Sequence, residues 1–373
     1  MQNCGIKKII LSGGGTGGSV TPLLAIKDII AGSPAEIRDT VFLFIGTKNG
    51  PEKQLAESAG IEFRTMISGK LRRYWSWQNI IDLFKVIIAF WRSIYILLKE
   101  KPDLILSAGS FVSVPLAWAA WFLNIPVLIF QLDVRPGLAN RLMAPIAKKI
   151  LTVFEKSAVD YGPKALVIGN PIRKEFVSVK VTKREALQKI GLQSNLPVIL
   201  AMGGGTGAAV INELVINNLP ELIKFCQIIH ITGKDKADER MKEAMIKSIN
   251  YRCFEFLDTF GLIKAYAAAD LIVSRAGMGS LTELAYVGKP VILIPMPDSH
   301  QEENAQIFEK SEAVILLNQK GLTGETLINN IKNIFSDEIL RKKLQVNIKK
   351  VINTECEDII IQTIDKLLSK EKA

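Results

Sequence analysis

The chain has 373 residues, which predicts about two domains, and its 48% hydrophobic residues are sufficient for two cores. The net charge of +10 indicates acidic partners, and in the absence of an RNA- or DNA-binding signature we expect a membrane surface and phosphorylated ligands rather than nucleic acid. Four cysteines without C-x-x-C spacing indicate reduced thiols in a cytosolic protein, and two histidines argue against a histidine-based metal site.

The N-terminal half alternates short apolar runs with helical patterns. Strands are predicted at 9–11, 41–45, 63–66, 104–107, 127–130, 150–153 and 165–168, with helices at 20–30, 51–58, 78–100 and 114–123. This alternation predicts a doubly wound parallel sheet. We expect no signal peptide, because the first apolar run is short and leads into glycines, and no membrane span, because prolines or charges interrupt both apolar stretches.

The C-terminal half repeats the pattern. After a crossing at 169–173 and a polar helix at 180–192, strands are predicted at 198–202, 227–232, 253–257, 271–274, 291–294 and 314–317. We therefore expect domains at 1–170 and 171–350. The remaining segment, 351–373, contains an amphipathic helix that can pack back across the junction.

A glycine-rich motif, Gly-Gly-Gly-Thr-Gly, occurs at 13–17 and again at 203–207, each time between a predicted strand and a helix. Such turns hold anions, because glycines allow close backbone approach and the helix start offers unpaired N–H groups. The first copy also fits the dinucleotide fingerprint, but the next strand ends in Gly46-Thr47 instead of an acidic residue. The alternative is that the turn has only a structural role, and the second copy of the motif argues against this alternative.

Two further loops follow strands of the second sheet. One strand ends at Ser274 and a helix is predicted to start near Ser280, with Glu283 in its first turn, where it can accept ribose hydroxyls. Alternatively, Glu283 is only the capping-box acid of Ser280. The other loop would place His300 and Gln301 at the carboxyl edge of the sheet, although an ordinary surface loop fits it as well.

These motifs resemble, in type and order, those of the MurG family of peptidoglycan glycosyltransferases: the two glycine loops, Gly-Asn-Pro-Ile-Arg at 169–173, Arg275 to Glu283, and Gln301-x-x-Asn304-Ala305. The resemblance covers nearly the whole chain. It implies a GT-B fold, α/β, with two Rossmann-like domains whose parallel sheets face each other across a cleft. The N-terminal domain would face the acceptor and the membrane, and the C-terminal domain would bind the UDP-sugar.

The resemblance also implies a reaction. N-acetylglucosamine would pass with inversion from UDP-GlcNAc to the C4 hydroxyl of a polyprenyl-diphosphate-linked MurNAc-pentapeptide, on the cytoplasmic face of the cell membrane, to which the protein would bind peripherally. UDP-GlcNAc is then a substrate, and neither cofactor nor metal is expected, because helix-end N–H groups stabilise the leaving diphosphate.

Individual roles follow from the same resemblance. Glu283 would bind the ribose, the amides of 278–282 the diphosphate, the backbone of Leu257 the uracil, and Gln301 the sugar hydroxyls. The complete implied donor site is Thr16, Gly17, Gly18, Asp133, Arg173, Gly205, Leu257, Met278, Gly279, Ser280, Leu281, Thr282, Glu283, His300 and Gln301.

The chain departs from the family pattern at the catalytic positions. Ser19 stands where the family usually has His, and Asp133 stands where it has Asn. A serine hydroxyl without a partner is a poor general base near neutral pH, whereas a buried aspartate can act as one. We therefore expect the acid–base role on Asp133, with Ser19 as the second catalytic candidate. The alternatives are that Asp133 caps the turn before Pro136, or that the departures mark a changed acceptor or lost catalysis.

The segment 70–98 mixes basic and aromatic residues, a combination typical of membrane-surface helices. A buried core helix is the alternative. The side chains expected at the membrane are Arg72, Arg73, Trp75, Trp77, Phe84 and Trp91. Three other functions stay open: another GT-B enzyme with a different lipid or small-molecule acceptor, a nucleotide-sugar-binding homologue without turnover, and, more distantly, a dehydrogenase.

Overall fold

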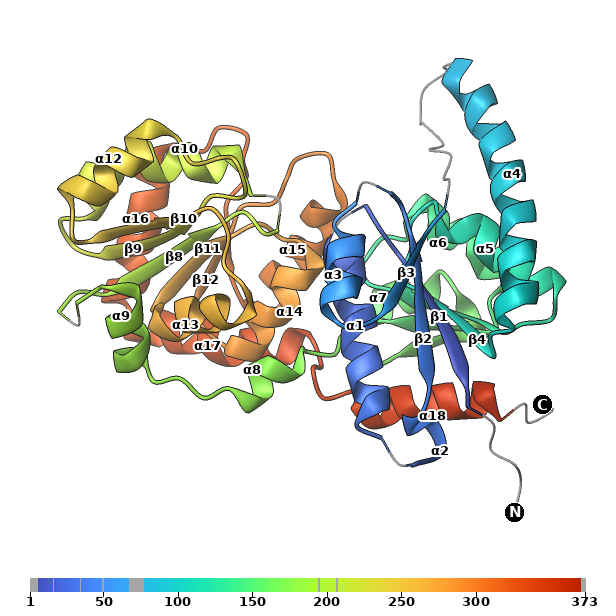
Figure 1. Ribbon diagram of the computed structural model, residues 1–373. Coiled ribbons are helices and arrows are strands. Elements are labelled where there is room, and N and C mark those ends of the chain that lie inside the picture. The colour runs from blue at the N-terminus through green and yellow to red at the C-terminus, as the bar shows by residue number, and fades with distance from the viewer. Residues whose placement is uncertain are drawn as a thin grey trace. The chain divides into compact units, whose positions relative to one another are not determined.

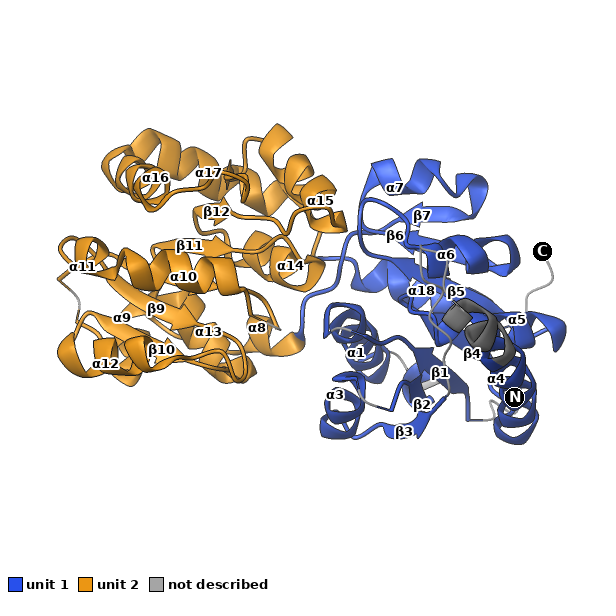
Figure 2. Ribbon diagram, turned by 90° about the horizontal axis from the view of Figure 1, so that it is seen from above, with its two compact units in different colours: residues 1–173, 355–373 blue, residues 174–354 orange. Residues whose placement is uncertain are grey.

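The computed structural model describes residues 6–15, 17–33, 35–48, 50–66, 77–193, 195–205 and 207–369, with only the backbone of residues 35, 36 and 77–84. The chain forms two compact units (Figure 2). Unit 1 comprises residues 1–173 and 355–373, and unit 2 comprises residues 174–354.

Unit 1 is built on one parallel sheet of seven strands in the order β3-β2-β1-β4-β5-β6-β7, of which Figure 1 labels β1 to β4. The central strands are buried along most of their length, as expected for a sheet with helices on both faces. The strands are β1 (Lys8–Ser12), β2 (Val41–Gly46), β3 (Glu62–Thr65), β4 (Leu104–Ser107), β5 (Val127–Gln131), β6 (Lys149–Thr152) and β7 (Ala165–Val167). The helices are α1 (Gly17–Ala31), α2 (Ala35–Arg38), α3 (Glu52–Ser58), α4 (Trp77–Glu100), α5 (Ser113–Phe122), α6 (Leu138–Met143), α7 (Glu155–Val159) and α18 (Glu357–Leu368).

Unit 2 repeats this plan with six parallel strands in the order β10-β9-β8-β11-β12-β13. The strands are β8 (Val198–Met202), β9 (Gln227–Ile231), β10 (Tyr251–Phe254), β11 (Leu271–Ser274), β12 (Val291–Leu293) and β13 (Ile315–Leu316). The helices are α8 (Lys174–Ser178), α9 (Lys183–Ile190), α10 (Ala209–Asn217), α11 (Leu219–Leu222), α12 (Glu239–Lys247), α13 (Thr259–Ala268), α14 (Met278–Val287), α15 (His300–Lys310), α16 (Gly324–Ser336) and α17 (Glu338–Val351). The prediction of two doubly wound parallel sheets is confirmed.

Each sheet has a switch point where the strand order reverses, between β1 and β4 in unit 1 and between β8 and β11 in unit 2. Open α/β sheets bind ligands outside the carboxyl ends of the strands at such a point. In both units the glycine loop follows the first of these two strands. The fold therefore places both glycine loops where a ligand is expected.

The C-terminal helix α18 belongs to unit 1, where it packs against α1. Its buried residues Ile360, Ile364 and Leu368 recur every four positions and form one face. At the end of the helix, Lys7 Nζ donates to the carbonyl oxygen of Leu368 over 3.2 Å. The chain thus returns to its first unit after completing the second.

The structure differs from the sequence-based elements at three points relevant to function. The short helices α6 and α7 follow strands where no helix was expected. Strand β10 ends at Phe254, so Leu257 lies beyond the strand and not at its end. Helix α14 begins at Met278 and not near Ser280. In the part of the chain that the structure describes, no helix has both the length and the apolarity to cross a membrane.

Candidate active site

In unit 2 the glycine loop after β8 is tightly enclosed. A Cβ on Gly203 would lie 2.1 Å from the amide nitrogen of Ala208, and one on Gly207 would lie 2.1 Å from the carbonyl oxygen of Thr232. Gly204 has a φ of +77°, and a Cβ there would lie 3.6 Å from Ser280 Oγ. Only glycines allow this conformation, and it brings the loop against the start of α14.

The first turn of α14 presents backbone rather than side chains. Its N-cap is Gly277, and no side chain caps it. Leu281 N donates to the carbonyl oxygen of Gly277 over 2.9 Å, which leaves the amides of residues 278–280 as the N–H groups without a partner inside the helix. A diphosphate can therefore bind at 278–280, a narrower set than the expected 278–282. The side chains of Met278, Leu281 and Thr282 are buried.

Glu283 lies in the second turn of α14, and the expectation that it lies in the first turn was wrong. The capping-box alternative was also wrong, because the N-cap is Gly277 and not Ser280. Instead, Tyr266 Oη on α13 donates to Glu283 Oε2 over 2.9 Å. The half-buried carboxylate is thereby held in one orientation by a buried tyrosine.

The loop after β12 is held in place by hydrogen bonds from the buried side chain of Arg275. The buried guanidinium of Arg275 donates through Nη1 to the carbonyl oxygens of Ile294 and Pro295, both over 2.9 Å. Burial lowers the pKa of Arg275. Asn304, fully buried on α15, donates through Nδ2 to the carbonyl oxygen of Ala276 over 3.3 Å and so ties α15 to the approach to α14.

Both polar residues expected in this loop lie in the first turn of α15 and are half-buried. Gln301 Oε1 accepts from Met296 N over 3.1 Å, and Ser299 caps the helix by accepting from Gln301 N over 3.2 Å. His300 precedes Gln301 at the carboxyl end of β12, the neighbour of β11. Leu257 is half-buried and lies further along the sheet, beside Asp258, which caps α13.

In unit 1 the first glycine loop lies at the carboxyl ends of β1 and β4. Helix α1 begins at Gly17, so Gly18 and Ser19 lie in its first turn, and Ser19 Oγ donates to the carbonyl oxygen of Gly14 over 3.3 Å. Thr16 lies outside the described residues. The serine hydroxyl thus braces the loop.

Asp133 lies two residues beyond the end of β5, next to a buried polar network that the sequence did not indicate. Gln131 Nε2 donates to the carbonyl oxygen of Asp133 over 2.6 Å, while Gln131 Oε1 accepts from Asn140 Nδ2 over 2.7 Å and from Tyr161 Oη over 3.0 Å. Burial raises the pKa of Tyr161, which therefore remains a hydroxyl donor. The N-cap of the following helix α6 is Gly137 and not Asp133. Arg173, another residue of the expected donor site, ends the 1–173 segment of unit 1, directly before unit 2 begins.

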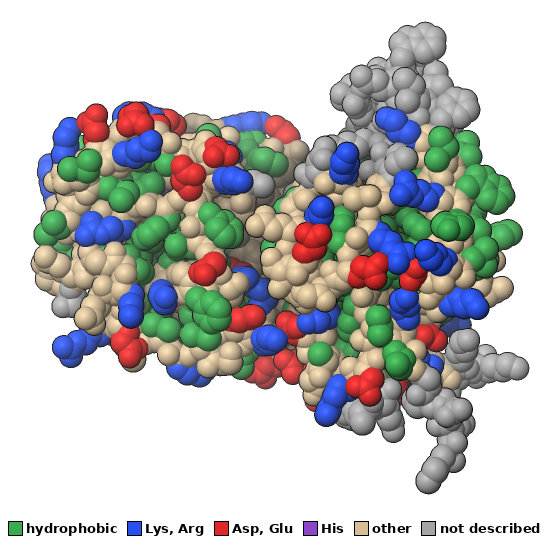
Figure 3. Space-filling view, viewed as in Figure 1, with side chains coloured by type: hydrophobic (Ala, Val, Ile, Leu, Met, Phe, Trp, Pro, Cys, Tyr) green, Lys and Arg blue, Asp and Glu red, His purple; other side chains and the backbone are tan. Residues whose placement is uncertain are grey.

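Of the side chains expected at the membrane, Arg72, Arg73 and Trp75 lie outside the described residues, and only the backbone of Trp77 and Phe84 is described, as part of α4. Trp91 is 64% exposed, although α4 also packs against α5. Hydrophobic side chains gather on this side of unit 1 with lysines and arginines beside them (Figure 3).

Part of this surface was not expected from the sequence. Trp121 is 53% exposed and Phe122 66% exposed at the end of α5, where the sequence suggested only a helix of the sheet core. The aromatic residues at 118, 121 and 122 recur at the spacing of one helix face and could have indicated it.

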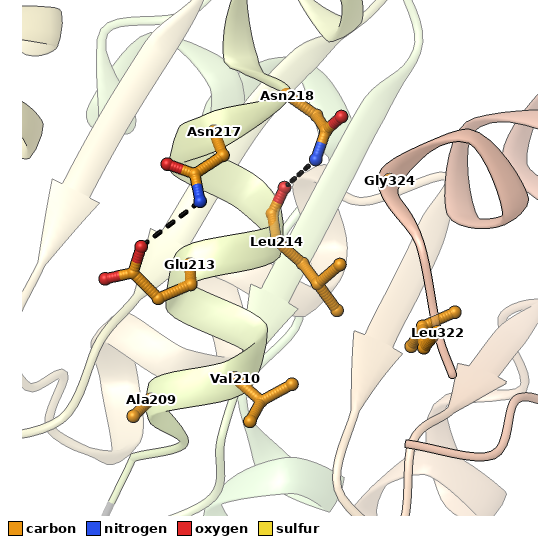
Figure 4. A pocket seen from close by; sticks show the side chains of 8 residues that line it. All are labelled: Ala209, Val210, Glu213, Leu214, Asn217, Asn218, Leu322 and Gly324. Atoms are coloured by element: carbon orange, nitrogen blue, oxygen red, sulfur yellow. Dashed lines mark hydrogen bonds between the residues drawn. The ribbon is translucent and has the colours of Figure 1, made fainter. Parts of the chain in front are cut away.

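A groove of about 390 Å³ runs along α10 and is lined by both polar and apolar residues (Figure 4). On its polar side, Asn217 Nδ2 donates to Glu213 Oε2 over 3.2 Å. None of the predicted donor residues lines this groove. Among the described residues, no group of three or more His, Cys, Asp or Glu side chains is arranged to hold a metal ion.

Known proteins are similar to this chain both in sequence and in fold. Residues 9–152 match the glycosyltransferase family 28 N-terminal domain, and residues 198–363 match the glycosyltransferase family 28 C-terminal domain. The fold is similar to the crystal structure of Acinetobacter baumannii MurG, with a TM-score of 0.74 and 24% identity over 96% of this chain and 99% of that chain. Two Rossmann-like units with these domains define a GT-B glycosyltransferase.

Two relatives specify the family further. One from Clostridium botulinum (strain Langeland) is 35% identical over 93% of this chain and 98% of its own length. One from Clostridium kluyveri is 38% identical over 88% of this chain and 91% of its own length. Both are named UDP-N-acetylglucosamine--N-acetylmuramyl-(pentapeptide) pyrophosphoryl-undecaprenol N-acetylglucosamine transferase. The chain belongs to this family, the MurG family.

Proposed function

We propose that the chain transfers N-acetylglucosamine from UDP-GlcNAc to the C4 hydroxyl of a polyprenyl-diphosphate-linked MurNAc-pentapeptide. The observation that carries the proposal is its similarity, over nearly the full length of both chains, to relatives named for this transfer. The donor-side geometry supports it, because the switch point of unit 2 combines a glycine loop with an uncapped helix start.

Each part of the donor would then meet a specific group in unit 2. The diphosphate binds the amides of residues 278–280, where the helix dipole favours negative charge. The ribose hydroxyls donate to Glu283, whose carboxylate Tyr266 orients. Gln301 binds the sugar hydroxyls beside His300, and the backbone of Leu257 meets the uracil.

The reaction is a single displacement. The acceptor oxygen forms a bond to the anomeric carbon, the bond from that carbon to the diphosphate oxygen breaks, and its electron pair leaves with UDP. The configuration changes from α to β, and the proton of the acceptor hydroxyl passes to Asp133. The amides at the start of α14 stabilise the charge that develops on the diphosphate, so we propose that no cation is needed.

We further propose that unit 1 attaches peripherally to the cytoplasmic face of the membrane through the exposed aromatic surface of α4 and α5. Trp91, Tyr95, Trp121 and Phe122 are all more than half exposed there, and aromatic rings of this kind sit at the membrane–water interface. The chain's net charge of +10 favours anionic lipids. The acceptor would then reach unit 1 at that surface through its lipid, while the donor binds unit 2.

The transfer is tested with labelled UDP-GlcNAc and three acceptors: a short-chain polyprenyl-diphosphate-MurNAc-pentapeptide, the same lipid without the sugar, and a soluble muramoyl peptide. We expect label in the first lipid only, with one UDP released per product. Label on another acceptor favours a different GT-B enzyme, and donor binding without product in any tube favours a homologue that has lost turnover.

A further inference from the structure

A fully buried carboxylate lies beneath the glycine loop of unit 1. Glu52, the first residue of α3, is 0% exposed. Thr47 donates to Glu52 Oε1 twice, through its hydroxyl and, over 2.9 Å, through its amide, while Gly15 N donates to Oε2 over 3.4 Å. The carboxylate therefore joins the loop after β1 to the loop after β2.

Three glycines make room for this side chain. A Cβ on Gly14 would lie 2.5 Å from Glu52 Oε1, one on Gly46 would lie 2.7 Å from Cγ, and one on Gly50 would lie 1.9 Å from Oε2. Real Cβ atoms do not come this close to other atoms, so a side chain at any of these positions would displace Glu52 from its present place. Gly14 lies in the loop after β1, Gly46 is the last residue of β2, and Gly50 lies in the loop between β2 and α3. The loops are thus built around Glu52.

Burying a carboxylate in the core is unfavourable unless hydrogen bonds satisfy it. A structural unit that needed only packing would be served by an apolar residue at position 52. The buried oxygens instead accept from the backbone N–H groups of Thr47 and Gly15 and from the Thr47 hydroxyl. Gly15 belongs to the glycine loop of unit 1, the unit expected to face the acceptor.

We propose that Glu52 is a positioning residue, which holds the β1–α1 glycine loop in the conformation that the sugar-transfer step requires. The expected effect on kcat rests on the proposed function, whereas the expected effect on the conformation of the loop does not. Glu52 lies in unit 1, whereas the groups proposed to bind the diphosphate, the ribose and the uracil lie in unit 2, so its loss should lower turnover and leave binding of the UDP portion of the donor intact.

The test compares Glu52→Gln with a matched control, Glu100→Gln. The side chain of Glu100 is 8% exposed in the same unit, but it pairs with Lys8 and Arg64, each over 2.5 Å, at the opposite end of β1. The amide group that Glu52→Gln introduces can replace only one acceptor oxygen and turns a donor toward either Thr47 or Gly15. We measure kcat, the KM for UDP-GlcNAc, and hydrogen exchange in the peptide that covers residues 13–18.

For Glu52→Gln we expect at least a tenfold lower kcat, a KM for UDP-GlcNAc within twofold of wild type, and at least fivefold faster exchange in this peptide. Glu100→Gln should change none of the three. Unchanged kcat and exchange in Glu52→Gln, or an equal loss in Glu100→Gln, overturns the proposal.

If Glu52→Gln does not fold, Thr47→Val decides the question. It removes one hydroxyl donor to Glu52 and should shift kcat and exchange in the same direction by a smaller factor. Unchanged values would overturn the proposal. If the wild-type protein makes no product, the proposed function fails, and the exchange measurement alone decides whether Glu52 holds the loop.

Discussion

Tyr266 donates its hydroxyl to Glu283 Oε2 over 2.9 Å, and this bond joins α13 to the second turn of α14. The tyrosine is buried, and its ring lies 6.0 Å from that of Phe176, centroid to centroid. A rigid, desolvated donor of this kind fixes a carboxylate more firmly than solvent does. The orientation of the Glu283 carboxylate therefore depends on a residue outside its own helix.

Replacing Tyr266 by Phe removes this bond and keeps the ring. We expect UDP-GlcNAc to bind about fivefold to tenfold more weakly, since one hydrogen bond is worth about 1 kcal/mol. Isothermal titration measures the change. Tyr286→Phe removes a hydroxyl from the next turn of α14 and should leave the affinity unchanged. Equal affinities of Tyr266→Phe and wild type would contradict the assigned role of Glu283.

Gly204 allows a second prediction, because its φ of +77° disfavours any other residue. Gly204→Ala strains the loop by about 1–2 kcal/mol and brings a methyl group toward Ser280, so we expect weaker donor binding. The matched control is Gly321→Ala in the same unit, where φ is +80° and the added Cβ meets nothing within 4 Å. That variant should lose similar stability and bind the donor normally. A loss of affinity in both variants would attribute the effect to stability.

Asp133 carries the acid–base role in the proposed mechanism. Asp133→Asn keeps the shape but cannot accept the proton, so we expect kcat to fall at least a hundredfold while the dissociation constant of UDP-GlcNAc stays the same. Ser19→Ala should reduce kcat less, because that hydroxyl is bonded to the carbonyl oxygen of Gly14. Single-turnover kinetics separates these effects, and full turnover of Asp133→Asn would remove Asp133 from the mechanism.

His230 makes the stability of unit 2 depend on pH. Its ring is fully buried in β9, with Nδ1 2.9 Å from Tyr251 Oη and Nε2 3.0 Å from Asn212 Oδ1, and burial lowers its pKa to about 4. Below about pH 6.5 the unfolded chain binds a proton that the folded protein excludes. The free energy of unfolding should therefore fall by about 2 kcal/mol from pH 7 to pH 5.

Urea unfolding at several pH values measures this slope. His230→Gln should be less stable at pH 7 but lose most of the slope, whereas His300→Gln, which removes the chain's other histidine, should keep it. An unchanged slope in His230→Gln would assign the pH dependence to other groups.

The membrane surface is tested by co-sedimentation with anionic vesicles. Trp91→Ser and Trp121→Ser, singly and together, should reduce binding, because each removes an exposed ring from the surface of α4 and α5. Ile246→Ser removes an exposed hydrophobic side chain from α12 in unit 2 and should not. Binding that persists in the double variant would place the contact elsewhere.

The fold could be predicted because buried parallel strands are continuous apolar runs, and β11 at Leu271–Ser274 matches the prediction in full. The first residues of helices were harder to predict from the sequence than the strands. Ser280 is a better capping residue than Gly277 by type, yet the turn places Gly277 at the N-cap. The bond between Tyr266 and Glu283 could not be predicted either, since it depends on how two helices pack.

The environment of Glu52 shows the same limit. Gly46 and Gly50 are close to Glu52 in the sequence, but Gly14 belongs to the loop after β1, and only the pairing of β1 with β2 brings it to the same carboxylate. The exposed aromatic residues of α5 were missed because the sequence pattern suggested burial. Their apolar run looked like core, and only the packing of α4 on α5 decides which face remains uncovered.

The most direct test of the donor site is hydrogen exchange in unit 2 with and without UDP-GlcNAc, in EDTA, with NAD as a control ligand. We expect UDP-GlcNAc to slow exchange of the amides at 203–205 and 278–280 without any added cation, and NAD to leave it unchanged. Protection confined to other segments, or protection that requires a divalent cation, would contradict binding of the diphosphate by the amides at the start of α14.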